Sequence, residues 1–243
     1  MKFLHVIFLM VVALYVGGVN AQTAIPAVQG LIPPGVEPGD KFYIIFAGSD
    51  TVDGAQSSAT YQAYAASVKT NDPITDQISG WITLFGHDDS SLVTTSALDY
   101  TNIPIYNRNG DKVADNRAEL FSSAQDSAIG YDEQGNPNAN NIWTGFNFTG
   151  GNTGIGDDSL GGNDSLADGC LAGNAAEADS EWAASVLAGG NGCTGVNLGM
   201  YVISPAFFIP EPSPLPILNI PGFVILLVLM GLIARRYFAR LRT

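Results

Sequence analysis

Basic side chains are scarce in this chain. Only 10 of its 243 residues are lysine or arginine, against 23 aspartates and glutamates, which gives a formal net charge of −13. A polyanion would be repelled, so the sequence excludes nucleic acid as a partner. The middle of the chain has no apolar run of the ~18 residues that a membrane span needs, which excludes a polytopic membrane protein. A hydrophobic fraction of 46%, with 10% aromatic residues, excludes an acidic disordered tail.

The first 21 residues have the three parts of a secretory signal peptide. Lys2 supplies the basic start, and an apolar run from Phe3 to Val16 follows, broken only by His5. Val19-Asn20-Ala21 provides a small-residue exit, so we expect the mature chain to begin near Gln22. An uncleaved signal anchor is the alternative.

The other end of the chain predicts a single membrane span. Residues 220–234 form a dense apolar block, and four arginines follow directly. A block of this kind with a basic flank crosses a bilayer and leaves its tail in the cytoplasm. The predicted organisation is a signal peptide (1–21), a Pro-rich leader or edge segment (22–40), an exported domain (41–208), a Pro-rich neck (209–219), a transmembrane helix (220–234) and a basic tail (235–243).

Three features follow one another in this C-terminal region. Pro210-Glu211-Pro212 comes first, the apolar block comes second, and Arg235-Arg236 comes last. This order resembles the PEP-type C-terminal sorting signal of Gram-negative bacteria. The resemblance implies an inner-membrane precursor, which an exosortase, a membrane cysteine protease, releases to the cell surface or the medium. Residues 215–222 depart from that pattern and resemble the sister signal that begins Ile-Pro-Thr-Leu. The identity of the sorting enzyme is therefore open, and an uncut tail anchor is the alternative.

Removing both ends makes the exported part more acidic. Residues 22–212 keep five basic residues and all 23 acidic ones, a difference of −18. Such a charge favours solubility and attracts cations or basic surfaces. A solvated acidic exterior is the simplest explanation.

The exported part mixes short strands with one or two helices. Tyr61, Tyr64, Ala65 and Val68 follow helical spacing, which predicts a helix over 58–69 capped by Ser57 or Ser58. A second, short helix is compatible with residues 113–121. The absence of a regular strand–helix alternation predicts a single α+β domain. Strands are predicted at residues 42–46, 81–85, 103–106, 141–145 and 200–203, and Asn109-Gly110 predicts a tight turn after the third of these.

The two cysteines, Cys170 and Cys193, stand 23 positions apart. In an exported chain this predicts a disulfide, which would stabilise the fold by roughly 3 kcal/mol. It would pin a loop region rich in glycine and aspartate, residues 149–190. His87, the only histidine of the mature chain, is too isolated in sequence to support a catalytic Cys–His pair.

Several motifs occur in an informative order over residues 41–205. They are Ile103-Pro-Ile-Tyr106, Lys112-Val-Ala-Asp-Asn116, Tyr131-Asp-Glu-x-Gly135 and Ile142-Trp-Thr-Gly145. This order is similar to a group of exported bacterial domains of unknown function that look like the C-type-lectin and endostatin fold. The resemblance implies that the terminal strands, 42–46 and 200–203, lie together. It also implies the order Cys170, Trp182, Cys193.

Calcium-dependent sugar binding can be tested against these motifs. C-type lectins hold sugar through a Glu-Pro-Asn or Gln-Pro-Asp loop and a Trp-Asn-Asp strand, whereas this chain has Asn136-Pro137-Asn138 and Trp143-Thr-Gly. The calcium-and-sugar residues of that family therefore cannot be carried over. Binding of carbohydrate, such as an exopolysaccharide, through another surface is an alternative.

One acidic loop is the best candidate for a metal site. Asp157, Asp158, Asp164 and Asp168 offer the hard oxygen ligands that Ca²⁺ prefers. The spacing faintly resembles a calcium-binding nonapeptide repeat, although Asp-Ser-Leu recurs here after six residues. A polar loop without metal is the alternative, and the sequence implies no other cofactor.

Motifs of catalysis are missing from the sequence. It has no Gly-x-Ser-x-Gly, HExxH or phosphate-binding loop. We therefore predict a non-enzymatic surface or extracellular-matrix protein, anchored by its C-terminal signal. A calcium- or carbohydrate-binding C-type-lectin-like module is the alternative.

Overall fold

The fold combines a mixed sheet with a few short helices, which confirms the α+β class. The computed structural model describes residues 25–87, 102–122, 124–146, 160, 169–189 and 193–212. The strands are β1 (Ile25–Pro26), β2 (Lys41–Ala47), β3 (Val52–Asp53), β4 (Ile82–Leu84), β5 (Ile105–Asn107), β6 (Lys112–Ala114), β7 (Asn141–Trp143), β8 (Cys170–Asn174), β9 (Val186–Ala188), β10 (Asn197–Ile203) and β11 (Phe207–Phe208). The helices are α2 (Ser58–Val68), α3 (Pro73–Asp76) and α4 (Arg117–Leu120), with 3-10 turns η1 (Lys69–Asn71) and η2 (Ser180–Trp182).

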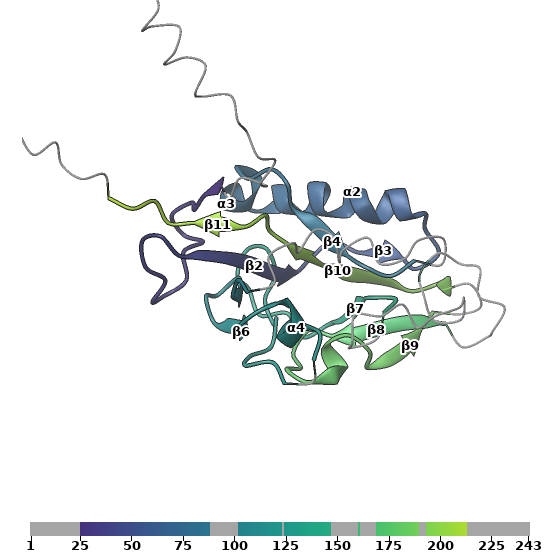
Figure 1. The fold of residues 1–243 in the computed structure, drawn as a ribbon. Coiled ribbons are helices and arrows are strands. Elements are labelled where there is room, and N and C mark those ends of the chain that lie inside the picture. Colours follow the sequence, from purple (N-terminus) through teal and green to yellow (C-terminus); the bar gives the residue numbers. More distant parts are fainter. Residues whose placement is uncertain are drawn as a thin grey trace, which may run out of the picture. The chain divides into compact units, whose positions relative to one another are not determined.

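Strand β10 organises the sheet, as Figure 1 shows. Its second half lies between β2 and β4, antiparallel to both, so that Tyr201 is opposite Ala47 on one side and Leu84 on the other. Its first half pairs with β3 in the antiparallel sense and with β7 in the parallel sense. The pairing of β2 with β10 confirms that the strands predicted at residues 42–46 and 200–203 lie together.

Strand β2 is apolar from Phe42 to Ala47 because both of its faces are buried there. Tyr43 and Ile45 belong to one hydrophobic cluster, whereas Phe42, Ile44 and Phe46 belong to a second cluster. Successive side chains of a strand point to opposite faces. The continuous run that predicted this strand is therefore the pattern of a strand covered on both sides.

Helix α2 covers one of these two faces. Ser57 caps it by accepting a hydrogen bond from the backbone N–H of Thr60, as predicted. The N–H of Ala65 donates to the Thr83 hydroxyl at 3.1 Å, which fixes the helix on β4. The helix buries all four residues whose spacing predicted it, namely Tyr61, Tyr64, Ala65 and Val68.

The prediction of a helix over 113–121 is wrong in its first half. Residues 112–114 form strand β6, which pairs with β5 across the predicted Asn109-Gly110 turn. Asn116 then has an extended backbone, and its side chain accepts from the N–H of Glu119. This cap starts α4 at Arg117, and the strand pairing prevails over the helical pattern before it.

Two segments expected outside the regular structure belong to the sheet. Within residues 149–190, β8 pairs with β7 and with β9, so this segment is not loop throughout. In the region expected as a leader or edge segment, β1 pairs in parallel with β11, and Leu31 lies in the core. Residues 25–40 are thus an edge segment of the domain.

Candidate functional site

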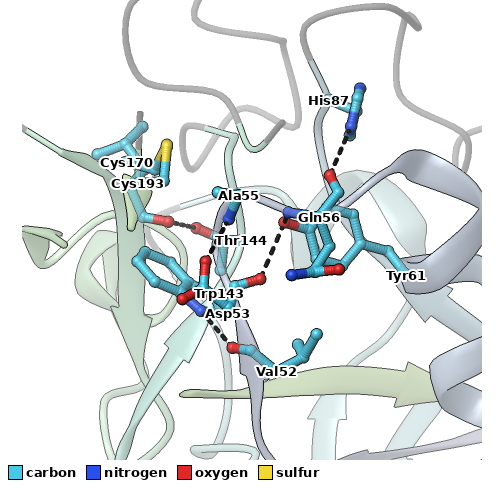
Figure 2. The surroundings of a disulfide bond; sticks show 11 residues. Val52, Asp53, Ala55, Gln56, Tyr61, His87, Trp143, Thr144, Cys170 and Cys193 are labelled. Carbon is cyan, nitrogen blue, oxygen red and sulfur yellow. Dashed lines mark hydrogen bonds between the residues drawn. A yellow bond between two sulfur atoms is a disulfide. The ribbon is translucent and has the colours of Figure 1, made fainter. Parts of the chain in front are cut away.

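The two cysteines form a buried disulfide, as Figure 2 shows. Their Cα atoms are 5.2 Å apart, and the bond joins the start of β8 to the segment before β10. Gly54 lies against it: a Cβ on this residue would stand 2.9 Å from the Cβ of Cys193 and 2.7 Å from the Trp143 ring. The disulfide therefore packs directly against the segment that follows β3.

The other predicted site residues are distributed unevenly. Pro210, Glu211 and Pro212 are exposed, and they follow β11 after a single residue, Ile209. The candidate calcium ligands Asp157, Asp158, Asp164 and Asp168, the predicted span 220–234, and Arg235 and Arg236 lie outside the described residues.

Two kinds of feature are absent from the described ranges, namely a membrane-spanning helix and a cluster of metal ligands. None of their helices has the length and apolar character that a bilayer crossing requires. Within the same ranges, no three side chains of histidine, cysteine, aspartate or glutamate come together as metal ligands would. The calcium site therefore stays a prediction about residues outside them.

A hollow of about 350 Å³ lies beside the first half of β10. Its size is within the usual range of ligand pockets, roughly 300–1,000 Å³. None of the described residues that line it is charged. We call it the amide groove, after a lining that includes Ser49, Thr51, Asn138, Asn140, Asn141 and Asn197.

Most of the polar side chains in the amide groove make no hydrogen bond to the described part of the protein. Asn140, Asn141, Asn197 and Thr51 make no side-chain hydrogen bond within the described part of the chain. Asn138 is different, because it is buried and donates to the carbonyl of Ala47 at 3.1 Å. The groove thus has one buried, hydrogen-bonded amide and three amides that make no side-chain hydrogen bond to the described residues.

One wall of the groove is an irregularity in the sheet. Ala47 is opposite Tyr201 and Val52 is opposite Leu198, so residues 48–51 face only two residues of β10. This is a large β-bulge, which we call the 48–51 bulge. A Cβ on Gly199 would lie 2.4 Å from the carbonyl oxygen of Gly48, so the two backbones meet only because residue 199 is glycine.

Glu133 fixes the middle of this bulge from within the protein. One carboxylate oxygen accepts from the Ser49 N–H at 3.0 Å, and the other accepts from the Ser49 hydroxyl. The second oxygen also accepts from the Asn71 amide at 3.1 Å. Glu133 is fully buried, and these bonds satisfy a group that would be costly to leave unpaired.

Two aromatic side chains hold the 48–51 bulge and the residue that follows it. The Tyr64 hydroxyl donates to the carbonyl of Asp50 at 2.6 Å. The Trp143 indole donates to the carbonyl of Val52, the first residue of β3, at 2.9 Å (Figure 2). Burial raises the pKa of the Tyr64 phenol well above its ordinary value, and the charges of Asp50 and Glu133 add to the rise. The phenol therefore stays protonated and keeps its donor at neutral pH.

A buried ion pair positions the loop that carries Glu133. Arg108 and Asp72 meet at 2.9 Å, with side chains 9% and 10% exposed. The same guanidinium donates to the backbone carbonyls of Glu133, at 2.9 Å, and of Gly30, at 3.1 Å. Arg108 therefore ties the edge segment, the start of α3 and the Glu133 loop together.

Only some residues of the amide groove and its support could be predicted from the sequence. Tyr131-Asp-Glu-x-Gly135 stood out as a motif, but nothing local connects Glu133 with Ser49, 84 positions earlier. The density of asparagine over residues 136–141 is a local signal that could have marked the groove. The exposed amide of Asn197 could be added only by the pairing of β10 with β7.

No protein-family model matches this chain, and searches of curated proteins and of solved structures also found no match.

Proposed function

We propose that this is an exported, non-enzymatic protein that binds a partner at the cell surface or in the extracellular matrix. Its C-terminal signal anchors the precursor in the inner membrane of a Gram-negative bacterium, and an exosortase-type protease then releases it. The observation that carries this proposal is the exposed Pro-Glu-Pro motif, which begins two residues after the end of β11. The last residue of β11 is Phe208, and residues 210–212 are exposed.

The exposure of the chain after β11 also supports the sorting role. Pro210, Glu211 and Pro212 are all exposed and lie outside the strands. A protease needs an accessible chain, and exposed segments outside the regular structure are the usual sites of cleavage. Release in this region would leave the sheet complete, because β11 precedes it.

The disulfide supports a location outside the cytoplasm. Disulfides persist in oxidising compartments and are rare in the cytosol. Cys170 and Cys193 lie in the core and pack beside Gly54 and Trp143, so the fold depends on the bond locally. This arrangement suits a protein that matures after export.

The amide groove supports binding rather than catalysis. General acid–base and nucleophilic catalysis need titratable or activated side chains at the reacting atoms. The described lining of the groove offers carboxamides and hydroxyls instead.

We also propose that the domain is C-type-lectin-like. The β2–β10 pairing and the order Cys170, Trp182, Cys193 support this fold.

Substitution of the motif tests the sorting role. In an exosortase-bearing host, replacing Pro210, Glu211 and Pro212 with alanine should retain the protein in the membrane fraction, while the wild type reaches the surface or the medium. Gln62→Ala, on the exposed face of α2, is the control and should be released normally. Equal release of the triple-alanine variant would contradict this role.

A further inference from the structure

We infer that the amide groove binds a neutral oligosaccharide directly, without a metal ion. This inference rests on the proposed binding role and names its ligand class. The groove is the place where uncommitted polar side chains, a suitable volume and a rigid wall come together. Each of these three features restricts the kind of ligand that fits.

The side chains of the groove match the hydrogen-bonding pattern of a sugar. A carboxamide presents two N–H donors and one acceptor oxygen, and a hydroxyl both donates and accepts. Asn140, Asn141, Asn197 and Thr51 therefore offer both kinds of group over a short distance. Neighbouring hydroxyls of a saccharide need this mixture, whereas an apolar ligand would cover the amides and leave them unpaired.

The absence of charge from the described lining determines which saccharides fit. No arginine or lysine of the lining is present to pair with a carboxylate or sulfate group, and no acidic residue is present to pair with an ammonium group. The exported part carries an excess of 18 negative charges, which repels polyanions. A neutral saccharide has no charged group that would stay unpaired in the groove, and the acidic exterior does not repel it.

The anchored bulge lowers the entropic cost of binding. Ser49 is held by Glu133, Asp50 is held by Tyr64, and Val52 is held by Trp143. A wall that is already ordered does not lose conformational freedom when the ligand arrives. The ligand contacts come from this fixed wall and from the ends of β7 and β10.

Metal-independent recognition follows from the same lining. Carboxylates are the usual ligands of Ca²⁺, and none is among the described residues of the groove. Binding here should therefore persist in EDTA. The predicted calcium ligands, Asp157, Asp158, Asp164 and Asp168, are not needed for it.

The test uses the mature protein purified from cells that export it. A glycan array with neutral, anionic and cationic members identifies the bound class, and titration calorimetry with the best neutral oligosaccharide gives its Kd with and without EDTA. We expect binding to neutral members, with the same Kd in EDTA. Binding to anionic or cationic members alone, or to no member, would overturn the inference.

Substitutions place the ligand in the groove. Asn140→Ala and Asn197→Ala should each weaken binding by about tenfold, as expected for one lost hydrogen bond. Both side chains are exposed, so the thermal midpoint should not change. Gln62→Ala removes an exposed carboxamide elsewhere and should leave the Kd unchanged.

Unchanged affinity in both asparagine variants would place the sugar elsewhere and contradict the inference. A change caused by misfolding would also appear in the thermal midpoint, which separates the two effects. Export and release are measured independently by fractionation. A protein that is released normally but binds no glycan would overturn the groove assignment and leave the sorting role intact.

Discussion

The carboxylate of Glu133 accepts hydrogen bonds from both the backbone N–H and the hydroxyl of Ser49, 84 positions earlier in the chain. This pair joins the turn before β7 to the bulge that follows β2. Together with the Asn71 amide, it places three donors around one buried carboxylate. The shape of the amide groove depends on this arrangement.

Glu133→Gln should destabilise the protein and loosen the 48–51 bulge that forms one wall of the amide groove. The side-chain NH₂ of glutamine would replace one carboxylate oxygen, so a donor of Ser49 or Asn71 would lose its acceptor. A buried donor without an acceptor costs about 1–3 kcal/mol. Urea denaturation should show this loss in the free energy of unfolding. Glu181→Gln, an exposed substitution on η2, is the matched control and should change little. Equal stability of the two variants would contradict the role of Glu133.

Arg108→Met should have a larger effect. It leaves Asp72 without its partner in a buried position, which costs about 3–5 kcal/mol. Lys69→Met breaks the more exposed pair with Asp76 and should cost no more than about 1 kcal/mol. The comparison is made by chemical denaturation of both variants. A similar cost for the two would contradict the buried, paired role of Arg108 and Asp72.

Removal of the disulfide should lower the free energy of unfolding by roughly 3 kcal/mol. The variant is Cys170→Ser combined with Cys193→Ser, and thermal unfolding measures the loss. Reductant should destabilise the wild type and leave this variant unchanged. If reductant acts equally on both proteins, the bond does not account for the difference.

Alkaline pH should destabilise the folded state through buried tyrosines. Burial raises the pKa of Tyr64 and of Tyr201 above 10.0, so the unfolded chain loses these protons first. These two groups therefore contribute their full share of the free energy of unfolding below about pH 10. Above that pH the free energy of unfolding falls, by up to ~1.4 kcal/mol per pH unit for each group. Hydrogen bonds from Lys112 to Asp115 and Asp126 raise the pKa of Lys112 and act in the same direction.

The variant Tyr64→Phe isolates one of these groups. Its unfolding free energy should be lower at neutral pH, because the bond to the Asp50 carbonyl is lost. Its decline above pH 10 should be shallower than in the wild type, because one titrating group is absent. Denaturation curves between pH 8 and 11 provide both values. Parallel pH profiles would contradict the assignment of Tyr64.

Local patterns were sufficient to predict some elements of this fold. The apolar run of β2 and the helical spacing in α2 are contained in consecutive residues, and both elements were predicted. Strand β8 carries small residues, including Gly173, and forms because β7 and β9 pair with it. A Cβ at Gly173 would meet the carbonyl oxygen of Trp182, a contact that no local pattern reveals.

The same difference applies to the site. The cysteine pair could be predicted from two residues and an export signal, and the structure contains it. The amide groove could not be predicted, because its wall comes from the 48–51 bulge and its anchors come from Tyr64, Glu133 and Trp143. Those contacts join segments far apart in the sequence, and only the folded chain brings them together.

The most direct test of the proposed function is intact-mass and peptide mass spectrometry of the protein recovered from the cell surface or the medium. The account predicts a chain that begins near Gln22, keeps Cys170 linked to Cys193, and lacks Arg235 and Arg236. A surface-located protein that retains the arginine-rich tail would contradict release by a sorting protease. The same spectrum also tests the signal peptide and the disulfide.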